Sequence, residues 1–294
     1  MKKASVIFNR KSGRKKKYPV EYRIIDQLTR TGYDVEILYT ESDGGKSLAR
    51  RIAPKSDRIV AVGGDGTIGE VIGGIVESGA APELSILPAG TVNDYARTLG
   101  ISLNLEGAVK NLSKPQRIIE ADVVKYNDVH AAYLIALGDF MESFTQVTSS
   151  RKNRYGTLAY LRAGLQALLT MKTYNVKIET GNEEITASSL LTIVANASSV
   201  GSFSKLLPKA KLDDHRLHIL NVEASNPKEI IEIIALALRG RIAEHKRVRY
   251  IQARQVKINT DRLEVMDVDG DSYPFEPLDI ELLPARIRLS IPVE

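Results

Sequence analysis

Apolar and polar positions change their spacing in a regular way along the first 120 residues. Short apolar runs of strand type alternate with segments whose apolar residues recur every three or four positions, as on one face of a helix. Gly32 is placed to end the first helical segment. We therefore expect strands at 4–9, 33–40, 57–64 and 83–91, separated by helices at 19–32, 44–53 and 67–79.

Strands that alternate with helices predict a parallel sheet covered on both faces. Ligands of such sheets bind beyond the carboxyl ends of the strands. Those ends carry the segments 9–13, 63–67 and 90–94 together with Thr40. The short polar motifs of this half therefore fall on one edge of the predicted sheet.

From about residue 121 the pattern changes to β-type runs rich in β-branched residues and punctuated by Gly, Asn, Asp and Pro. This pattern predicts a largely antiparallel β domain. Two helices are expected within it, at 155–171 and 226–240. The second has Asn226 as N-cap, Pro227 at its first position and Gly240 past its end.

Length and composition agree with two domains of middling size, because the chain has 294 residues, of which 43% are hydrophobic and 26% charged. No apolar run approaches the roughly 20 residues of a membrane span, and the N-terminus lacks the apolar core of a signal peptide. The expected location is the cytoplasm. The absence of cysteine excludes disulfides, a thiolate nucleophile and Cys-ligated metal sites. The four histidines lack the spacing of a metal hydrolase.

The net charge of +5 indicates anionic partners. The basic residues form three groups, which are Arg10, Lys11 and 14–17; Arg151, Lys152 and Arg154; and Arg239, Arg241, Lys246, Arg247 and Arg249. Each group is also typical of an ordinary solvated surface. Aromatic residues are 6% of the chain, with no tryptophan and none interleaved with the basic groups, so no nucleic-acid partner is expected.

The stretch "IVAVGGDGTIGEVIGGI" contains the pattern G-x-G-x-x-G at Gly64, Gly66 and Gly69. A dinucleotide site requires this pattern after the first strand and an acid about 20 residues on, at the end of the next strand. Two α/β units precede the glycines here, and Glu83 comes before the following strand, so the register fails. A phosphate-binding turn remains, with Asp65 available for magnesium. A tight turn that needs glycine only for its backbone is the open alternative.

Four motifs in order carry a family resemblance. "GGDGTIGEV" (63–71) followed by "LPAGTVNDYARTLGI" (87–101) is similar to the signature of the diacylglycerol kinase catalytic domain. "FNRKSGRKK" (8–16) resembles the family's N-P-x-S-G, "LLPKAKLDDHRL" (206–217) its P-x-A-x-x-D-D-G, and "DVDGDSY" (267–273) its D-G-E. The order and spacing most resemble the soluble bacterial diacylglycerol kinases and their lipid kinase relatives.

The resemblance implies an α/β plus β fold, with an N-terminal NAD-kinase-like α/β nucleotide domain and a C-terminal antiparallel β-sandwich. We expect the first domain at 1–121, completed by the last residues at about 286–294, and the lipid-substrate domain at 122–285. ATP and lipid would meet in the cleft between them. The implied reaction is phosphorylation of the primary hydroxyl of diacylglycerol to phosphatidate, with Mg²⁺ as cofactor.

Two alternatives stay open: a kinase of another lipid alcohol, such as a prenol or a sphingoid base, and a non-catalytic nucleotide- or lipid-binding regulator. Either lipid kinase would visit an anionic membrane surface from solution through the basic groups. A homodimer is also left open.

The resemblance assigns site residues by position. Asp269 is the expected general base toward the lipid hydroxyl. Taken alone, Asp-Gly-Asp between β runs is also typical of a hairpin turn, which stays open as the alternative for Asp269. Asp271, Asp65 and Asp94 complete the expected catalytic carboxylates. The expected ATP-binding residues are Asn9, Thr40, Gly63, Gly64, Asp65, Gly66, Thr67, Ile68, Gly69 and Thr91. A structural cation is expected on the Asp214 side chain and the carbonyls of Lys211 and Arg216. Asp122 either joins the carboxylate network or is a polar residue at a strand start.

Three positions depart from the family pattern. Gly69 replaces an asparagine, His215 a glycine, and Asp271 a glutamate that is one methylene longer. A left-handed backbone at position 215 would suit histidine less well than glycine. The segment "ALGDFMESF" (136–144) is also less glycine-rich than its counterpart.

Overall fold

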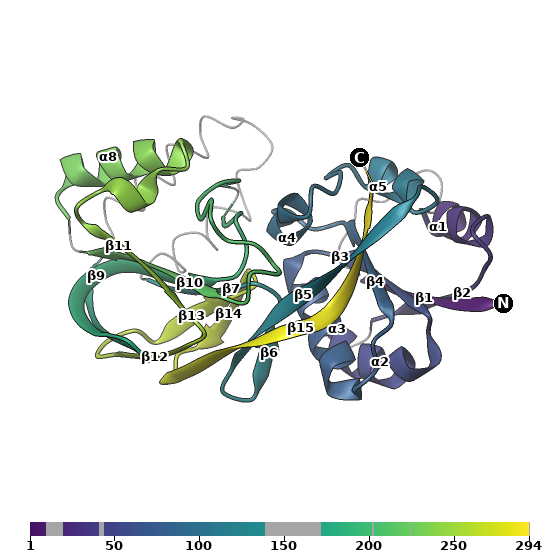
Figure 1. The fold of residues 1–294 in the computed structure, drawn as a ribbon, viewed down its shortest axis with the longest axis horizontal. Coiled ribbons are helices and arrows are strands. Elements are labelled where there is room, and N and C mark those ends of the chain that lie inside the picture. Colours follow the sequence, from purple (N-terminus) through teal and green to yellow (C-terminus); the bar gives the residue numbers. More distant parts are fainter. Residues whose placement is uncertain (10–19, 41–43, 139–171, 202, 224, 294) are drawn as a thin grey trace.

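The computed structural model describes residues 1–9, 20–40, 44–138, 172–201, 203–223 and 225–293. Several sequence expectations lie outside these residues: the helix at 155–171, residues 10–16 of "FNRKSGRKK", residues 139–144 of "ALGDFMESF", and the basic groups at 10–17 and 151–154. Within them, an α/β domain lies beside a β-rich domain (Figure 1). The predicted fold class is confirmed.

The α/β domain is built on a parallel sheet in the order β2-β1-β3-β4. The strands are β1 (Lys2–Phe8), β2 (Tyr33–Tyr39), β3 (Arg58–Gly63) and β4 (Glu83–Pro88). β3 is buried at every residue, as expected of a strand covered on both faces. α1 (Val20–Thr29) and α5 (Leu105–Asn111) lie on one face, and α2 (Gly44–Ile52) and α3 (Asp65–Ser78) on the other (Figure 1). The short η1 (Ala53–Lys55) and α4 (Asp94–Thr98) complete it.

Close packing against α2 fixes the position of α3. A Cβ on Gly74 would overlap the Lys46 carbonyl and come within 2.7 Å of the Ala49 Cβ, so only glycine allows the two helix backbones to approach this closely. α3 ends where Gly79 takes a left-handed backbone, with φ of 69°. Packing at Gly74 and the cap at Gly79 therefore fix the C-terminal half of α3.

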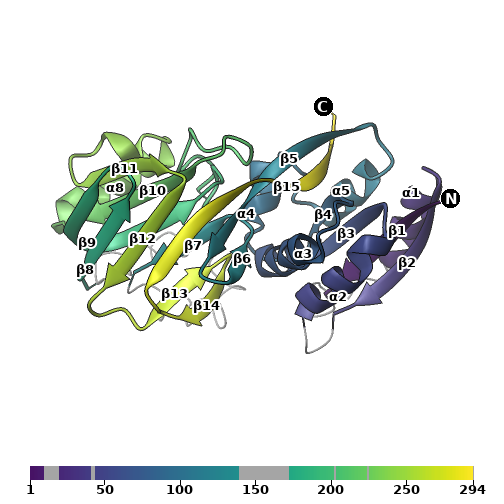
Figure 2. The same cartoon turned by 60° about the horizontal axis from the view of Figure 1, so that its bottom comes forward.

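The second domain is a curled, largely antiparallel arrangement of strands (Figure 2). Its strands are β5 (Gln116–Tyr126), β6 (Val129–Ala131), β7 (Leu134–Leu137), β8 (Tyr174–Thr180), β9 (Glu184–Ala195), β10 (Leu217–Glu223), β11 (Val248–Ala253), β12 (Gln255–Thr260), β13 (Val265–Val268), β14 (Asp271–Pro274) and β15 (Leu278–Pro292). The order β14-β13-β7-β9-β8-β12-β15 is extended by β10 and β11 beside β9 and by β6 beside β5. A separate hydrophobic core, including the fully buried Ile178, Ile219 and Ile280, fills it.

Two long strands, β5 and β15, run through both domains. They pair from Ile280 with Tyr126 to Pro292 with Gln116, and their register shifts between Leu283 and Ile287. Beyond this shift β15 also pairs in parallel with β4. The sheet is therefore continuous from one domain to the other, and the predicted boundaries at 121 and 285 stay predictions.

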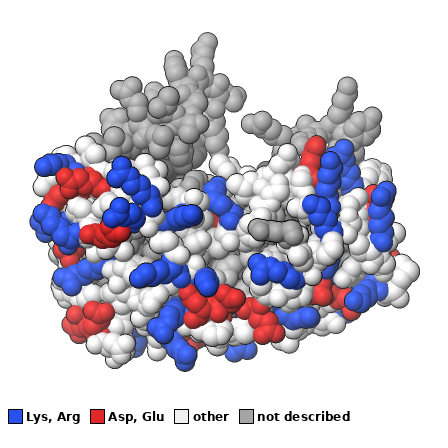
Figure 3. Space-filling model, turned by 45° about the horizontal axis from the view of Figure 1, so that its top comes forward, with Lys and Arg blue, Asp and Glu red and all other residues white. Residues whose placement is uncertain are grey.

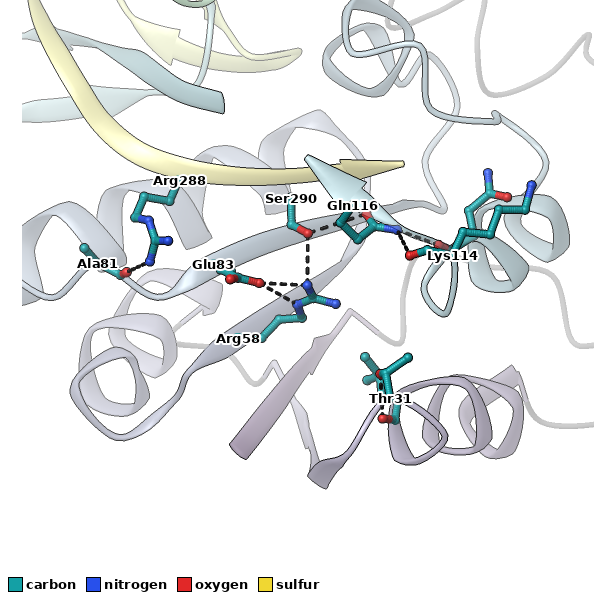
Figure 4. A network of polar contacts seen from close by, with 10 residues as sticks. Thr31, Arg58, Ala81, Glu83, Lys114, Gln116, Arg288 and Ser290 are labelled. Atoms are coloured by element: carbon teal, nitrogen blue, oxygen red, sulfur yellow. Dashed lines mark hydrogen bonds and ion pairs between the residues drawn. The ribbon is translucent and has the colours of Figure 1, made fainter. Parts of the chain in front are cut away.

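Polar contacts fasten the end of β15 to the first domain (Figure 4). The buried Arg58 on β3 donates from Nη2 to Glu83 Oε2 at 2.7 Å and to Ser290 Oγ at 3.1 Å. Arg288 donates to the Ala81 carbonyl at 3.4 Å. The last strand is thus held by side chains as well as by the sheet ladder.

The helix α8 (Pro227–Leu238) lies on the outside of the second domain (Figure 1), followed by η2 (Ile242–Glu244). Asn226 and Glu229 form a capping box, and Gly240 past the end has φ of 69°. The predicted caps of this helix are confirmed. Among the described residues, no helix is both long enough and apolar enough to cross a membrane.

Candidate active site

Three loops meet at the carboxyl ends of the parallel strands. Asn9, after β1, donates from Nδ2 to Thr67 Oγ1 at 2.9 Å. The loop after β4 lies against the loop after β3, because a Cβ on Gly90 would come within 2.5 Å of the Gly64 Cα. Asn93 braces this second loop by bonding the N–H of Gly90 at 3.0 Å and its carbonyl at 3.1 Å. The polar motifs thus occupy one edge of the sheet.

The glycine turn leads directly into the N-terminus of α3. Gly64 is the N-cap, and Asp65, Gly66 and Thr67 form the first turn. The first N–H groups of a helix have no intrahelical acceptor, and the helix dipole adds positive potential there. A Cβ on Gly63 would lie 2.5 Å from the Thr67 Cβ, so this turn requires glycine. The glycine turn and the first turn of α3, residues 63–67, are the predicted phosphate cradle, and their backbone N–H groups have the arrangement that binds phosphate in other proteins.

The other residues predicted to bind the nucleotide, Ile68, Thr40 and Thr91, differ in burial and in their backbone hydrogen bonds. Ile68 has its side chain in the core and its N–H bonded to the Gly64 carbonyl at 3.0 Å. Thr40, half-buried after β2, donates its N–H to the Phe8 carbonyl at 3.1 Å. Thr91 is exposed in the loop after β4. Their roles in binding ATP stay predictions.

Asp65 lies between the cradle and α4. Its two carboxylate oxygens accept the N–H groups of Asp94 at 3.1 Å and Tyr95 at 3.0 Å. Burial raises the pKa of Asp65 to about 6, with Asp94 adding to the rise and the N–H bonds opposing it. This carboxylate is therefore oriented by backbone donors and is easier to protonate than an exposed one.

Asp94, the first residue of α4, joins the two domains. Its side chain is 1% exposed, and its Oδ1 accepts the hydroxyl of Ser199 at 2.7 Å. Ser199 was not foreseen from the sequence, because only the tertiary fold brings a residue 105 positions away to this carboxylate. This contact holds α4, whose first N–H groups bind Asp65, against the second domain.

Asp269 lies at the tip of the β13–β14 hairpin. Asp269 and Gly270 have φ of 52° and 92°, which are left-handed values suited to a two-residue hairpin turn. The Asp269 carboxylate accepts the N–H groups of Ala132 at 2.6 Å, Tyr133 at 3.0 Å and Leu134 at 3.1 Å. Burial raises the pKa of Asp269 to about 7 despite these three bonds. Its proton affinity is thereby matched to neutral pH.

Two further carboxylates flank Asp269 on the same hairpin. Asp267 is 8% exposed, and its Oδ1 accepts the Gly270 N–H at 3.0 Å. Burial raises the pKa of Asp267 to about 6, with Asp271 and Asp65 contributing. Burial also raises the pKa of Asp271. Asp267 was not foreseen from the sequence. It lies two positions before Asp269, and side chains at this spacing in a strand point to the same face, which is a sequence feature that could have indicated it.

The hairpin lies directly against the first turns of α3. A Cβ on Gly66 would overlap Asp271 Oδ2, and a Cβ on Gly69 would lie 2.5 Å from Asp269 Oδ2. The structure therefore brings together the predicted carboxylates Asp65, Asp269 and Asp271 at the cradle, with Asp267 beside them. Carboxylate oxygens are ligands that Mg²⁺ prefers in proteins.

The loop "KLDDHRL" forms a separate group of contacts. Asp214 accepts the N–H groups of Lys211 and Arg216, both at 3.1 Å, and lies 2.8 Å from His218 Nε2. Its carboxylate is occupied by donors, and the predicted use of the Lys211 and Arg216 carbonyls for a cation stays a prediction. In the described part of the chain, no three His, Asp or Glu side chains converge to hold a metal by themselves.

His215 has the left-handed backbone that the family's glycine implied, with φ of 59°. Asp122, fully buried on β5, accepts its N–H at 2.8 Å and lies 2.8 Å from its Nδ1. Asp122 also accepts the Ala285 N–H at 2.9 Å, where the register of β15 shifts. Asp122 therefore fastens the loop to the strands that connect the domains, with its carboxylate occupied by these donors.

A phosphate cradle on an α/β domain, faced by a buried carboxylate on a β-sandwich, defines a two-domain phosphotransferase. A model of the diacylglycerol kinase catalytic domain matches residues 3–126, and one of the YegS C-terminal NAD kinase beta sandwich-like domain matches residues 142–291. The chain belongs to the diacylglycerol kinase family, whose members are kinases that use ATP.

Relatives match along nearly the whole chain. A diacylglycerol kinase of Staphylococcus haemolyticus is 33% identical over 291 residues, which cover 98% of this chain and 88% of that protein. One of Staphylococcus aureus strain MRSA252 is 32% identical over 272 residues, 92% of this chain and 86% of that protein. The crystal structure of a Bacillus anthracis diacylglycerol kinase superposes with a TM-score of 0.81 at 27% identity, covering 98% and 96% of the two chains.

Proposed function

We propose that this kinase transfers the γ-phosphoryl group of ATP to the primary hydroxyl of diacylglycerol, giving phosphatidate and ADP. The observation that carries the proposal is Asp269, a buried carboxylate with a pKa of about 7 that lies against the helix of the phosphate cradle. A general base works best when its pKa is close to the operating pH. None of the relatives reported above supports a prenol or sphingoid base as acceptor.

In the proposed reaction the lipid hydroxyl oxygen forms a bond to the γ-phosphorus as the bond to the bridging oxygen breaks. ADP leaves with the electron pair of that bond. Asp269 accepts the hydroxyl proton, and the N–H groups of Ala132, Tyr133 and Leu134 hold its carboxylate in place during the transfer. Phosphoryl transfer depends mainly on such positioning and on charge neutralisation.

The cradle residues Gly63 to Thr67 would hold the phosphates through backbone N–H groups, with Asn9 fixing Thr67. We assign Mg²⁺ to Asp271 and, through water, to Asp65 and Asp94, because Mg²⁺ usually takes one or two carboxylates and completes its shell with water and phosphate oxygens. Mg²⁺ would supply neutralisation of phosphate charge. A cation on Asp214 would have to displace donors from a carboxylate that already accepts two N–H groups.

We also propose a transient contact with an anionic membrane surface through the outer side of α8. Ile231 and Leu238 there are 52% and 64% exposed. Lys228 on the same helix and Arg239 at its C-cap are exposed. Basic and acidic side chains are mixed over this face of the molecule (Figure 3). Each well-placed basic side chain adds about 1 kcal/mol of attraction to an anionic surface. Two apolar side chains are few for a stable dimer, which buries roughly 1,200 Å² or more.

Labelled ATP and Mg²⁺ with vesicles that carry diacylglycerol, a prenol or a sphingoid base test the proposal. We expect labelled phosphatidate from diacylglycerol, faster on phosphatidylglycerol than on phosphatidylcholine vesicles. Transfer only to another lipid would overturn the substrate, and ATP binding without any transfer would favour the regulator alternative. Equal rates on the two vesicle types would contradict the membrane contact.

A further inference from the structure

Gly69 lies where the general base meets α3. A Cβ at this position would lie 2.5 Å from Asp269 Oδ2, 3.4 Å from its Cγ and 3.7 Å from the Ala132 nitrogen. Real Cβ atoms essentially never approach a heavy atom to within 3.0 Å. With Asp269 in this position, no side chain fits at 69, including the asparagine of the family pattern.

The Asp269 carboxylate is prevented from moving away. Three backbone N–H groups bind its two oxygens, the closest at 2.6 Å from Oδ2, and the residue is 4% exposed. Moving Oδ2 would leave a buried donor without its acceptor, which is unfavourable. The overlap would therefore be relieved by separation of the hairpin from α3.

Two other glycines on α3 serve as comparisons. The Asp271 side chain that faces Gly66 is exposed, and no hydrogen bond to its carboxylate is found among the described residues, so it is able to rotate. A Cβ on Gly73 would lie 3.5 Å from the His130 Cβ, an ordinary van der Waals contact. Among these three glycines, only Gly69 would bring a Cβ within 3.0 Å of an atom that hydrogen bonds hold in place.

We propose that Gly69 is a positioning residue for Asp269. Its missing side chain lets the carboxylate of the second domain lie against the helix that begins at the phosphate cradle. The proposal rests on the proposed function, since it assigns Gly69 to the same reaction. It also explains a departure from the family pattern: glycine at 69 shortens the separation between base and cradle.

Kinetics of Gly69→Ala and Gly73→Ala test this role with matched changes on one helix. Gly69→Ala is expected to lower kcat roughly 10- to 100-fold, as a displacement of about 1 Å does, while KM for ATP stays within about threefold. Gly73→Ala is expected to keep the parent kcat. A kcat for Gly69→Ala equal to that of Gly73→Ala, or a loss seen only in KM, would overturn the proposal.

A stability cycle tests the contact independently of catalysis. Alanine favours a helix interior over glycine, so Gly69→Ala would stabilise α3 if the overlap were absent. Because of the overlap, we expect Gly69→Ala to lower Tm by roughly 3–8 °C in the parent protein. In an Asp269→Gly background, where the overlap is removed, Gly69→Ala should leave Tm unchanged or raise it. Glycine suits the left-handed backbone at 269. Equal shifts in both backgrounds would overturn the contact even if lipid phosphorylation were confirmed.

Discussion

At the scale of single residues, the environment of Asp269 gives it two functions at once. The sequence Asp-Gly-Asp is typical of a hairpin turn, and the positive φ values of Asp269 and Gly270 confirm such a turn. The same backbone directs the carboxylate inward to three N–H donors from the 132–134 segment. The turn and the proposed base are therefore one structure rather than alternatives.

The pKa of Asp269 predicts the pH dependence of the reaction. Its ordinary value is 3.8, and in the fold it is about 7, so the ionised fraction that accepts a proton falls about tenfold per pH unit below 7. We expect kcat at saturating substrates to rise through about pH 7 and to level off above it. The same shift lowers stability as pH rises from about 4 to about 7, because the unfolded chain loses this proton first.

A profile of kcat from pH 5.5 to 9 checks this expectation. The control is ATP affinity over the same range, which should change far less. A kcat that is constant between pH 6 and 8 would contradict a base with this pKa.

Some of the site residues could be predicted from the sequence, and others could not because they come together only in the folded chain. Asp65, Asp94, Asp269 and Asp271 were recognised because they lie in contiguous motifs. The donors at 132–134 and the Ser199 hydroxyl bind carboxylates more than 100 positions away, so only strand pairing across the fold places them. For Asp267 the sequence offers one weak indication, which is that it alternates with the apolar Val268 along the strand.

At the scale of elements, the alternation of strands and helices predicted the parallel sheet and its functional edge. α3 begins at Asp65, two residues before the predicted start, because Gly64 is already the N-cap and the glycine turn runs directly into the helix. α4 and α5 are five and seven residues long, too short for a periodic pattern to reveal. α3 carries the largest share of the site, since its first turn forms the cradle and Gly69 faces Asp269.

If residues 63–67 bind the phosphates of ATP, Gly66→Val is expected to weaken ATP binding strongly. Even where Asp271 rotates away, a β-branched side chain would occupy the phosphate approach at the first turn of α3. Titration calorimetry with ATP and Mg²⁺ should show at least a 100-fold loss of affinity. Gly181→Val is the matched control, since a Cβ there meets no atom within 4 Å. Equal ATP affinity in both variants would contradict the cradle.

At the scale of the whole molecule, β5 and β15 make the two domains parts of one sheet. The hydrophobic pattern predicted both domains. It did not show that β5 and β15 each belong to both, because the pattern of a β strand does not change where the strand passes from one hydrophobic core to the other. Asp122 holds the register shift of β15, and Arg58 fastens its end. The position of Asp269 relative to the cradle depends on this connection.

Arg58→Met tests how much the connection stabilises the molecule. Arg58 is 6% exposed, and its removal leaves Glu83, with 22% of its side chain exposed, without its partner. We expect the free energy of unfolding in urea to fall by about 3 kcal/mol. Arg30→Met removes an exposed pair with Asp26 and should cost less than about 1 kcal/mol. Equal costs would show that the Arg58 network adds nothing beyond the sheet ladder.

The most direct test of Asp269 as general base is lipid phosphorylation by Asp269→Asn, measured with ATP affinity on the same preparation. Asparagine is tolerated in a left-handed turn but does not accept the hydroxyl proton as a carboxylate does. We expect kcat to fall by roughly 10²- to 10⁴-fold while ATP affinity stays within a few-fold of the parent. A folded Asp269→Asn protein that phosphorylates diacylglycerol at the parent rate would contradict the account.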